Sequence, residues 1–241
     1  MLPKIDTPIY DLTLPLCKKK IRFRPFLVKE EKILLMAIES EDENAMLLAV
    51  KQIVNNCCLN PDFDVEGLPL SDLEFLFLNL RARSVGEVVE LQYKCNNKTN
   101  PDSEEECGNL VKFDLNLLEI QPEIPEGHTN KIELSPKMGF LMKYPSMKSM
   151  ETVQGNNVEK LMDILISCID CIYDEDNMYY AKDQTKEELI EFVENLNRVQ
   201  FAELQKFFET LPKVKKELHF HCDKCGYDEN IFVEGIQNFF V

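Results

Sequence analysis

Glycine is scarce in this chain, which has 8 glycines among 241 residues. Loops that bind phosphate need glycine at fixed positions, and neither G-x-x-x-x-G-K-[ST] nor G-x-G-x-x-G occurs. The G-x-S-x-G turn of many hydrolases and the H-E-x-x-H motif of zinc proteases are missing as well. No catalytic motif remains, and we therefore expect a protein that is not an enzyme.

Basic charge is also in short supply, since 27 lysines and arginines face 43 aspartates and glutamates, for a net charge of −16. Nucleic acids and anionic membranes bind basic surfaces, so we expect neither of them as a partner. No apolar run reaches the length of a membrane span. The first twenty residues lack a basic stretch followed by a long apolar one, so we expect no signal peptide.

The hydrophobic pattern alternates between strand-like and helix-like segments without a βαβ series, which predicts an α+β fold built from antiparallel hairpins and helices. Hairpins are expected over residues 8–26, 86–118, 131–144 and 214–236, the second with a polar, acidic tip at 96–106. Helices are expected over 28–59, from a cap at Ser71, and over 158–173, 185–196 and 198–211. Residues 174–184 read as a loop. We expect four segments in one compact unit: 1–85, 86–145, 146–212 and 213–241, with the last docked on 86–118.

Four of the nine cysteines lie in two similar strand–turn–strand units. The strand ELQYKC ends at Cys95 and ELHFHC ends at Cys222, and each unit returns through Cys-Gly, at Cys107 and Cys225. Without a secretion signal, closely spaced cysteines indicate metal ligands more often than disulfides. The four thiolates match the ligand count of a structural zinc site, and zinc is the expected cofactor. The alternative is a set of four free thiols, because the eleven residues between Cys95 and Cys107 depart from a C-x-x-C spacing.

The remaining histidines and cysteines near such motifs have simpler interpretations. His219 and His221 alternate with Phe220 and Cys222 along a strand, so they are expected on the solvent face rather than among the ligands. Cys168 and Cys171 form a C-x-x-C inside the helix expected over 158–173, where cysteine serves as a small core residue. Tyr179 replaces the glycine that a calcium loop beginning at Asp174 would need.

A run of short motifs resembles a known family. RFRPF at 22–26 is followed by LVKEEKILLMA, the chain opens with PKIDTP at 3–8, and KYPS stands at 143–146. In this order they resemble the small hub-associated baseplate proteins of T4-type contractile-tailed bacteriophages, whose members often carry paired cysteine knuckles. The resemblance implies a non-catalytic structural or assembly role in the baseplate hub, with other baseplate proteins as partners. It implies that the protein is located in the host cytoplasm during assembly, and in the tail baseplate if it is retained there.

Two alternatives to a permanent hub component stay open at this point. One is a zinc-ribbon regulator that acts on nucleic acid or a polymerase, although neither cysteine unit carries a basic stripe with interleaved aromatic residues. The other is an assembly factor that leaves after the hub has formed.

Arg22 and Arg24 are the candidate contact residues, together with Phe26. On a strand both arginines lie on the face away from Ile21 and Phe23. They either pair with the protein's own carboxylates or contact another baseplate protein, because the arginine fork suits carboxylates and carbonyls and arginine is enriched at binding hot spots.

Overall fold

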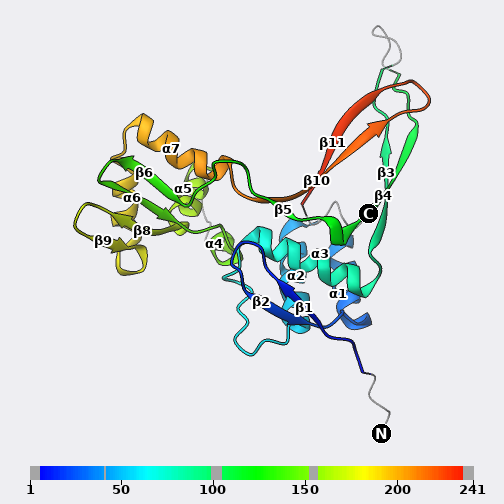
Figure 1. Ribbon diagram of the computed structural model, residues 1–241, viewed down its shortest axis with the longest axis horizontal. Coiled ribbons are helices and arrows are strands. Elements are labelled where there is room, and N and C mark those ends of the chain that lie inside the picture. The colour runs from blue at the N-terminus through cyan, green and yellow to red at the C-terminus, as the bar shows by residue number, and fades with distance from the viewer. Residues whose placement is uncertain (1–5, 41, 99–104, 152–156, 236–241) are drawn as a thin grey trace. The chain divides into compact units, whose positions relative to one another are not determined.

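The computed structural model describes residues 6–40, 42–98, 105–151 and 157–235 (Figure 1). The chain forms two compact units, one of Met1–Phe63, Ser71–Glu123 and Lys213–Val241, the other of Asp64–Leu70 and Ile124–Pro212. Helices and small antiparallel sheets make up both, so the expected α+β class is confirmed. Within the described ranges, no helix has the length and apolar character that a membrane span requires.

The N-terminal part of the first unit packs a small hairpin on helices. Strands β1 (Tyr10–Thr13) and β2 (Lys20–Phe23) pair antiparallel, and the helices are α1 (Val28–Glu39), α2 (Glu43–Cys57) and α3 (Leu70–Ser84). The hairpin and the two helices expected over 28–59 are confirmed. The buried carboxylate of Asp72 accepts the backbone N–H groups of Leu16 and Cys17 at 2.9 and 2.8 Å, which fixes the hairpin turn on α3. Since α3 already begins at Leu70, the expected cap at Ser71 is wrong.

Two further hairpins complete the first unit and lie side by side in Figure 1. Strands β3 (Val88–Lys94) and β4 (Leu110–Asn116) form the first, and β10 (Lys213–His221) and β11 (Asp228–Glu234) form the second. A short 3-10 helix, η1 (Leu117–Glu119), leads into β5 (Pro122–Glu123), which pairs with the start of β10. Both hairpins were expected, and each turn carries two of the four candidate cysteines.

The second unit is a four-stranded antiparallel sheet in the order β6–β7–β8–β9 with helices around it. Its strands are β6 (Lys131–Ser135), β7 (Met138–Met142), β8 (Ile169–Tyr173) and β9 (Met178–Tyr180). Its helices are α4 (Met147–Glu151), α5 (Asn157–Ser167), η2 (Ala181–Asp183), α6 (Lys186–Glu194) and α7 (Arg198–Glu209). Thr185 caps α6 in a reciprocal exchange of hydrogen bonds with Glu188, at the start of the helix expected over 185–196.

The helix expected over 158–173 is wrong in its second half. Helix α5 ends at Ser167, and Ile169–Tyr173 form β8, which lies between β7 and β9. Ile169 and Ile172 of β8 also continue the three- and four-residue spacing of the apolar residues in α5, so periodicity alone could not separate the strand from a helix. The loop expected at 174–184 is also wrong in part, because strand β9 and the 3-10 helix η2 lie within that segment.

Candidate metal centre

The thiol sulfurs of Cys95, Cys107, Cys222 and Cys225 gather where the two hairpins of the first unit meet, all within 4.8 Å of one another. The Sγ atoms of Cys95 and Cys225 are 3.7 Å apart, and so are those of Cys107 and Cys222. In a regular tetrahedron with Zn–S bonds of about 2.3 Å, neighbouring sulfurs are about 3.8 Å apart. Two of the sulfur–sulfur distances match this spacing, and the four sulfurs have the ligand count of a tetrahedral thiolate site.

The two turns that hold the sulfurs have the same backbone hydrogen bonds. The carbonyl of Cys95 accepts the N–H of Gly108 at 3.0 Å, and the carbonyl of Cys222 accepts the N–H of Gly226 at 2.8 Å. The N–H groups of Cys95 and Cys222 in turn donate to the carbonyl two residues beyond the second cysteine of their unit, at 2.8 and 2.9 Å. The near-repeat seen in the sequence is therefore a repeated structure.

The long spacing in the first turn is bridged by a narrow neck. The N–H of Cys107 donates to the carbonyl of Asn97 at 2.8 Å, and Lys98 and Glu106 form an isolated β-bridge just beyond it. Lys94 adds an ion pair with Glu106 at 2.8 Å. Both cysteines consequently stay at the base of the loop, as a C-x-x-C turn would place them. Most of the polar tip expected at 96–106 lies outside the described residues.

Two asparagines that the sequence analysis missed donate hydrogen bonds to sulfur. The side-chain amide of Asn109 donates to Cys222 at 3.5 Å, and that of Asn97 donates to Cys225 at 3.6 Å, in each case across the hairpin interface. The backbone N–H of each asparagine points to the sulfur of the cysteine two residues before it. Such donors stabilise negative charge on sulfur and orient metal-bound thiolates. The signal available in the sequence was asparagine at the second position after a cysteine in both strands of one hairpin.

Within the shared site, the pKa of Cys222 is lowered and the pKa of Cys95 is raised. Burial raises the pKa of Cys222, but hydrogen bonds from the backbone N–H groups of Cys225 and Lys224 and from Asn109 outweigh it and lower the pKa to about 6. Burial raises the pKa of Cys95 to about 12. Without a cation nearby, four neighbouring thiolates would repel one another, whereas a bound divalent cation favours the deprotonated form of every ligand.

Beneath the sulfurs lies a small apolar cluster that joins the hairpins. The rings of Phe113 on β4 and Phe220 on β10 are 6.2 Å apart, with Tyr93 and Tyr227 on either side. Among the residues that the structure describes, the buried part of this cluster consists of Phe220 and the three cysteines at 95, 107 and 222. So small a core makes a further cross-link between the hairpins valuable for their stability.

The two strand histidines lie apart from the sulfurs. His221 Nδ1 is 2.7 Å from Asp228, and His219 Nδ1 is 3.2 Å from Asn230, on the exposed face of the β10–β11 hairpin. Neither joins the cysteine cluster. The alternation of strand β10 places them as the sequence predicts.

Cys168 and Cys171 belong to the core of the second unit. Both side chains are fully buried, and Cys168 packs in the main hydrophobic cluster beside β8. Burial raises the pKa of Cys168 to about 11, which keeps it a neutral thiol. They are core residues as expected, although Cys171 lies on a strand and Cys168 between α5 and that strand rather than within a helix.

The three candidate contact residues have different environments in the structure. Arg24 forms an ion pair with the fully buried Glu30 at 3.1 Å, and its side chain is only 15% exposed. Phe26 is buried too, with 7% of its surface exposed. Arg22 lies in solvent, 62% exposed and 3.7 Å from the exposed Asp11. Arg24 has the internal partner that one alternative requires, while Arg22 is accessible to another protein.

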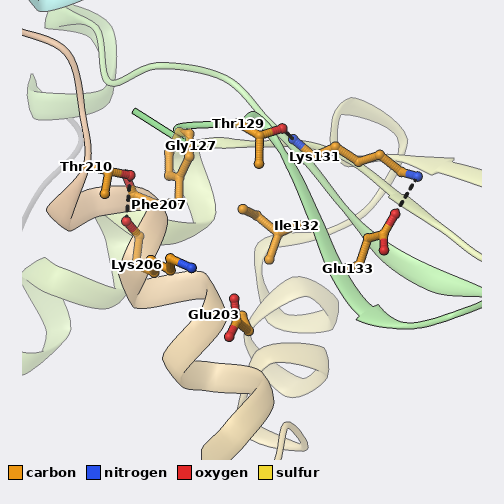
Figure 2. Close-up of a pocket in the computed structure, with 9 residues that line it drawn as sticks. All are labelled: Gly127, Thr129, Lys131, Ile132, Glu133, Glu203, Lys206, Phe207 and Thr210. Atoms are coloured by element: carbon orange, nitrogen blue, oxygen red, sulfur yellow. Dashed lines mark hydrogen bonds and ion pairs between the residues drawn. The ribbon is translucent and has the colours of Figure 1, made fainter. Parts of the chain in front are cut away.

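A hollow of about 360 Å³ opens in the second unit between β6 and α7 (Figure 2). Lys131 and Glu133 line it from β6, paired with each other at 2.9 Å, and Glu203 and Lys206 line it from α7. Its two lysines are matched by two glutamates, so the lining favours neither an anionic nor a cationic ligand. We assign no ligand to this hollow.

The sequence model of a family described as T4 bacteriophage base plate protein matches residues 7–241. The match spans both compact units and all four clustered cysteines. No curated protein sequence and no solved structure matches the chain.

Proposed function

Because the chain belongs to the T4 bacteriophage base plate protein family, we propose that it serves in the baseplate hub as a non-enzymatic structural or assembly component. The observation that carries this proposal is the family match over nearly the whole chain. Membership in this family makes the phage tail its place of action and other baseplate proteins its partners. The assignment to the hub rests on the motifs at 3–8, 22–26 and 143–146.

In this proposal, zinc bound at the cysteine cluster links the two hairpins of the first unit. Four clustered sulfur donors suit zinc, which is stable in a closed four-ligand site and has no redox chemistry of its own. The ligands would be Cys95 and Cys107 from the β3–β4 hairpin and Cys222 and Cys225 from the β10–β11 hairpin. Metal bound there cross-links segments more than 100 residues apart and contributes directly to the free energy of folding.

A regulator that binds nucleic acid through these hairpins fits the structure less well. The lysines beside the cysteines already have partners within the protein: Lys94 pairs with Glu106, and Lys224 donates to the carbonyl of Cys107 at 2.9 Å. The chain as a whole carries a charge of −16. Phosphate binding needs several cations that are free to release counterions.

The test is complementation of a phage from which this gene has been deleted. Wild-type protein supplied in trans should restore complete tails, which are counted by electron microscopy and by infectious titre. Cys107→Ser should fail to do so while Cys171→Ala succeeds, because only the first removes a proposed zinc ligand. Normal tails in the complete absence of the protein would contradict a hub function.

Quantitative mass spectrometry of purified virions then separates the two hub roles. A fixed number of copies per virion identifies a permanent component. Absence from virions, combined with presence on isolated hub intermediates, identifies an assembly factor.

A further inference from the structure

Helix α1 presents an apolar face to solvent. Val28 is 80% exposed, Leu35 54% and Met36 62%, which is unusual for three large apolar residues on one helix face. The opposite stripe of the same helix packs into the unit and consists of Glu30, Leu34 and Ala37. The exposed residues therefore do not pack in the core of the unit, and a partner can contact them.

Two charged residues, Lys32 and Glu39, lie in the same exposed stripe. Positions 28, 32, 35 and 39 are spaced by four, three and four residues, which aligns them along one face of a helix. Neither Lys32 nor Glu39 has an ion-pair partner among the residues that the structure describes. At 1.5 Å of rise per residue, each lies about 5 Å from the midpoint between Leu35 and Met36, on opposite sides of it.

We propose that α1 pairs antiparallel with α1 of a second copy of this chain, about a twofold axis that passes between Leu35 and Met36. Leu35 and Met36 of both copies meet at the axis. Lys32 of each copy then faces Glu39 of the other, so that two equivalent ion pairs flank the apolar centre. A twofold interface uses one surface twice and must be self-complementary, which this stripe is.

The charges also select the direction of the pairing. A parallel arrangement would set Lys32 against Lys32 and Glu39 against Glu39 and would be repulsive. The antiparallel one makes both contacts attractive and places the helix dipoles in opposition as well. An unrelated helix could cover the apolar residues, but it would need its own matched charges, whereas a second copy supplies them by symmetry.

The contact is small. One pair of helix faces buries less than the roughly 1,200–2,000 Å² of a standard stable interface. Dimerisation should therefore depend on protein concentration, and it should become effective where many copies are brought together. This self-association goes beyond membership of a baseplate and does not rest on the zinc site.

The test is analytical ultracentrifugation of the full-length, zinc-loaded chain from micromolar to several hundred micromolar concentration. We expect a monomer–dimer equilibrium. Lys32→Glu and Glu39→Lys should each weaken the dimer about threefold to tenfold, because each replaces two attractive contacts by two repulsive ones. The double variant Lys32→Glu/Glu39→Lys should restore the wild-type dissociation constant, a rescue that no loss of folding can imitate.

A matched control exchanges an exposed ion pair that lies within one copy. Lys137 and Glu175 are paired at 2.6 Å, and Lys137→Glu/Glu175→Lys should leave the dimer unchanged. Leu35→Glu should abolish it while circular dichroism and thermal unfolding stay close to wild type. A chain that remains monomeric at every concentration overturns the proposal. So does a dimer insensitive to Leu35→Glu, or a monomer in which Leu35→Glu blocks tail assembly, since the face would then belong to another baseplate protein.

Discussion

Gly108 and Gly226 occupy the same position in the two cysteine turns, with φ angles of 67° and 70°. Each follows the second cysteine of its hairpin, and each donates its N–H to the carbonyl of the first cysteine. A positive φ is costly for residues with a Cβ. Glycine is therefore needed at both positions for the backbone conformation of the turn, and not because a side chain would clash with neighbouring atoms. Indeed, a Cβ built on Gly226 meets no atom within 4 Å.

Substitution of Gly226 should therefore weaken metal binding through the backbone alone. Gly226→Val should cost about 1–2 kcal/mol, which corresponds to roughly tenfold weaker zinc affinity. Gly226→Asn should cost much less, because asparagine adopts the left-handed conformation more readily. Competition with a chromogenic chelator measures both affinities. Equal affinities for the two variants would show that the positive φ is not maintained in the metal-bound protein.

Loss of a proposed ligand should have a larger effect. Protein purified without chelator should contain about one zinc per chain, as a single closed four-ligand site requires. Cys222→Ser should lose the metal and destabilise the hairpin pair, because metal binding free energy is folding free energy at such sites. Metal analysis by mass spectrometry and thermal unfolding with and without chelator check both statements.

The two buried cysteines of the second unit supply the control. Cys168→Ala and Cys171→Ala should keep the full zinc content and lose only on the order of 1 kcal/mol of stability, for a small lost core contact. A wild-type protein that is fully folded without metal would contradict the structural role of zinc. Loss of zinc in either core variant would show that the ligands were wrongly assigned.

The sequence was informative about this site because its two halves repeat. The alternation before Cys95 and Cys222 and the Cys-Gly pairs predicted which hairpins would meet, and the cluster of their sulfurs confirms it. It did not reveal Asn97 and Asn109 as donors to sulfur, since those bonds cross between hairpins more than 100 residues apart. The repeated Cys-x-Asn spacing in the first hairpin was the only local sign of them, and which sulfur each amide reaches depends on the docking of the hairpins.

The strand β8 was predicted wrongly, as the second half of a helix. Ile169 and Ile172 lie three and four residues from apolar positions that continue the stripe of α5, so the helical period seemed to continue. Only the neighbouring strands on both sides decide that this segment is extended. Arg24 was also ambiguous for a tertiary reason, because its partner Glu30 lies on the next element and is buried there by α1 packing.

The Arg24–Glu30 pair predicts that the two neighbouring arginines contribute very differently to stability. Arg24→Ala should destabilise the first unit by about 3–5 kcal/mol, because it leaves the fully buried carboxylate of Glu30 without its main counter-charge. Arg22→Ala should change the free energy of unfolding by no more than about 0.5 kcal/mol, since Arg22 lies at the surface. Chemical denaturation compares the two. If Arg22→Ala nonetheless impairs tail assembly, Arg22 acts in a contact with another protein.

The same pair should make stability depend on acid pH in a defined direction. Burial raises the pKa of Glu30, but hydrogen bonds from Arg24 and the N–H of Leu27, together with the charge of Arg24, outweigh it and lower the pKa below its usual value of 4.5. The folded state therefore binds fewer protons than the unfolded state. The contribution of Glu30 is complete above the unfolded pKa and is lost as the pH falls through the lower folded pKa.

The difference in melting temperature between wild type and Glu30→Gln should thus be constant near neutral pH and shrink below about pH 4.5. Both proteins share the cysteine site, so acid release of metal cancels in the difference. A difference that stays constant down to pH 3 would mean that Glu30 is not held as a carboxylate by Arg24.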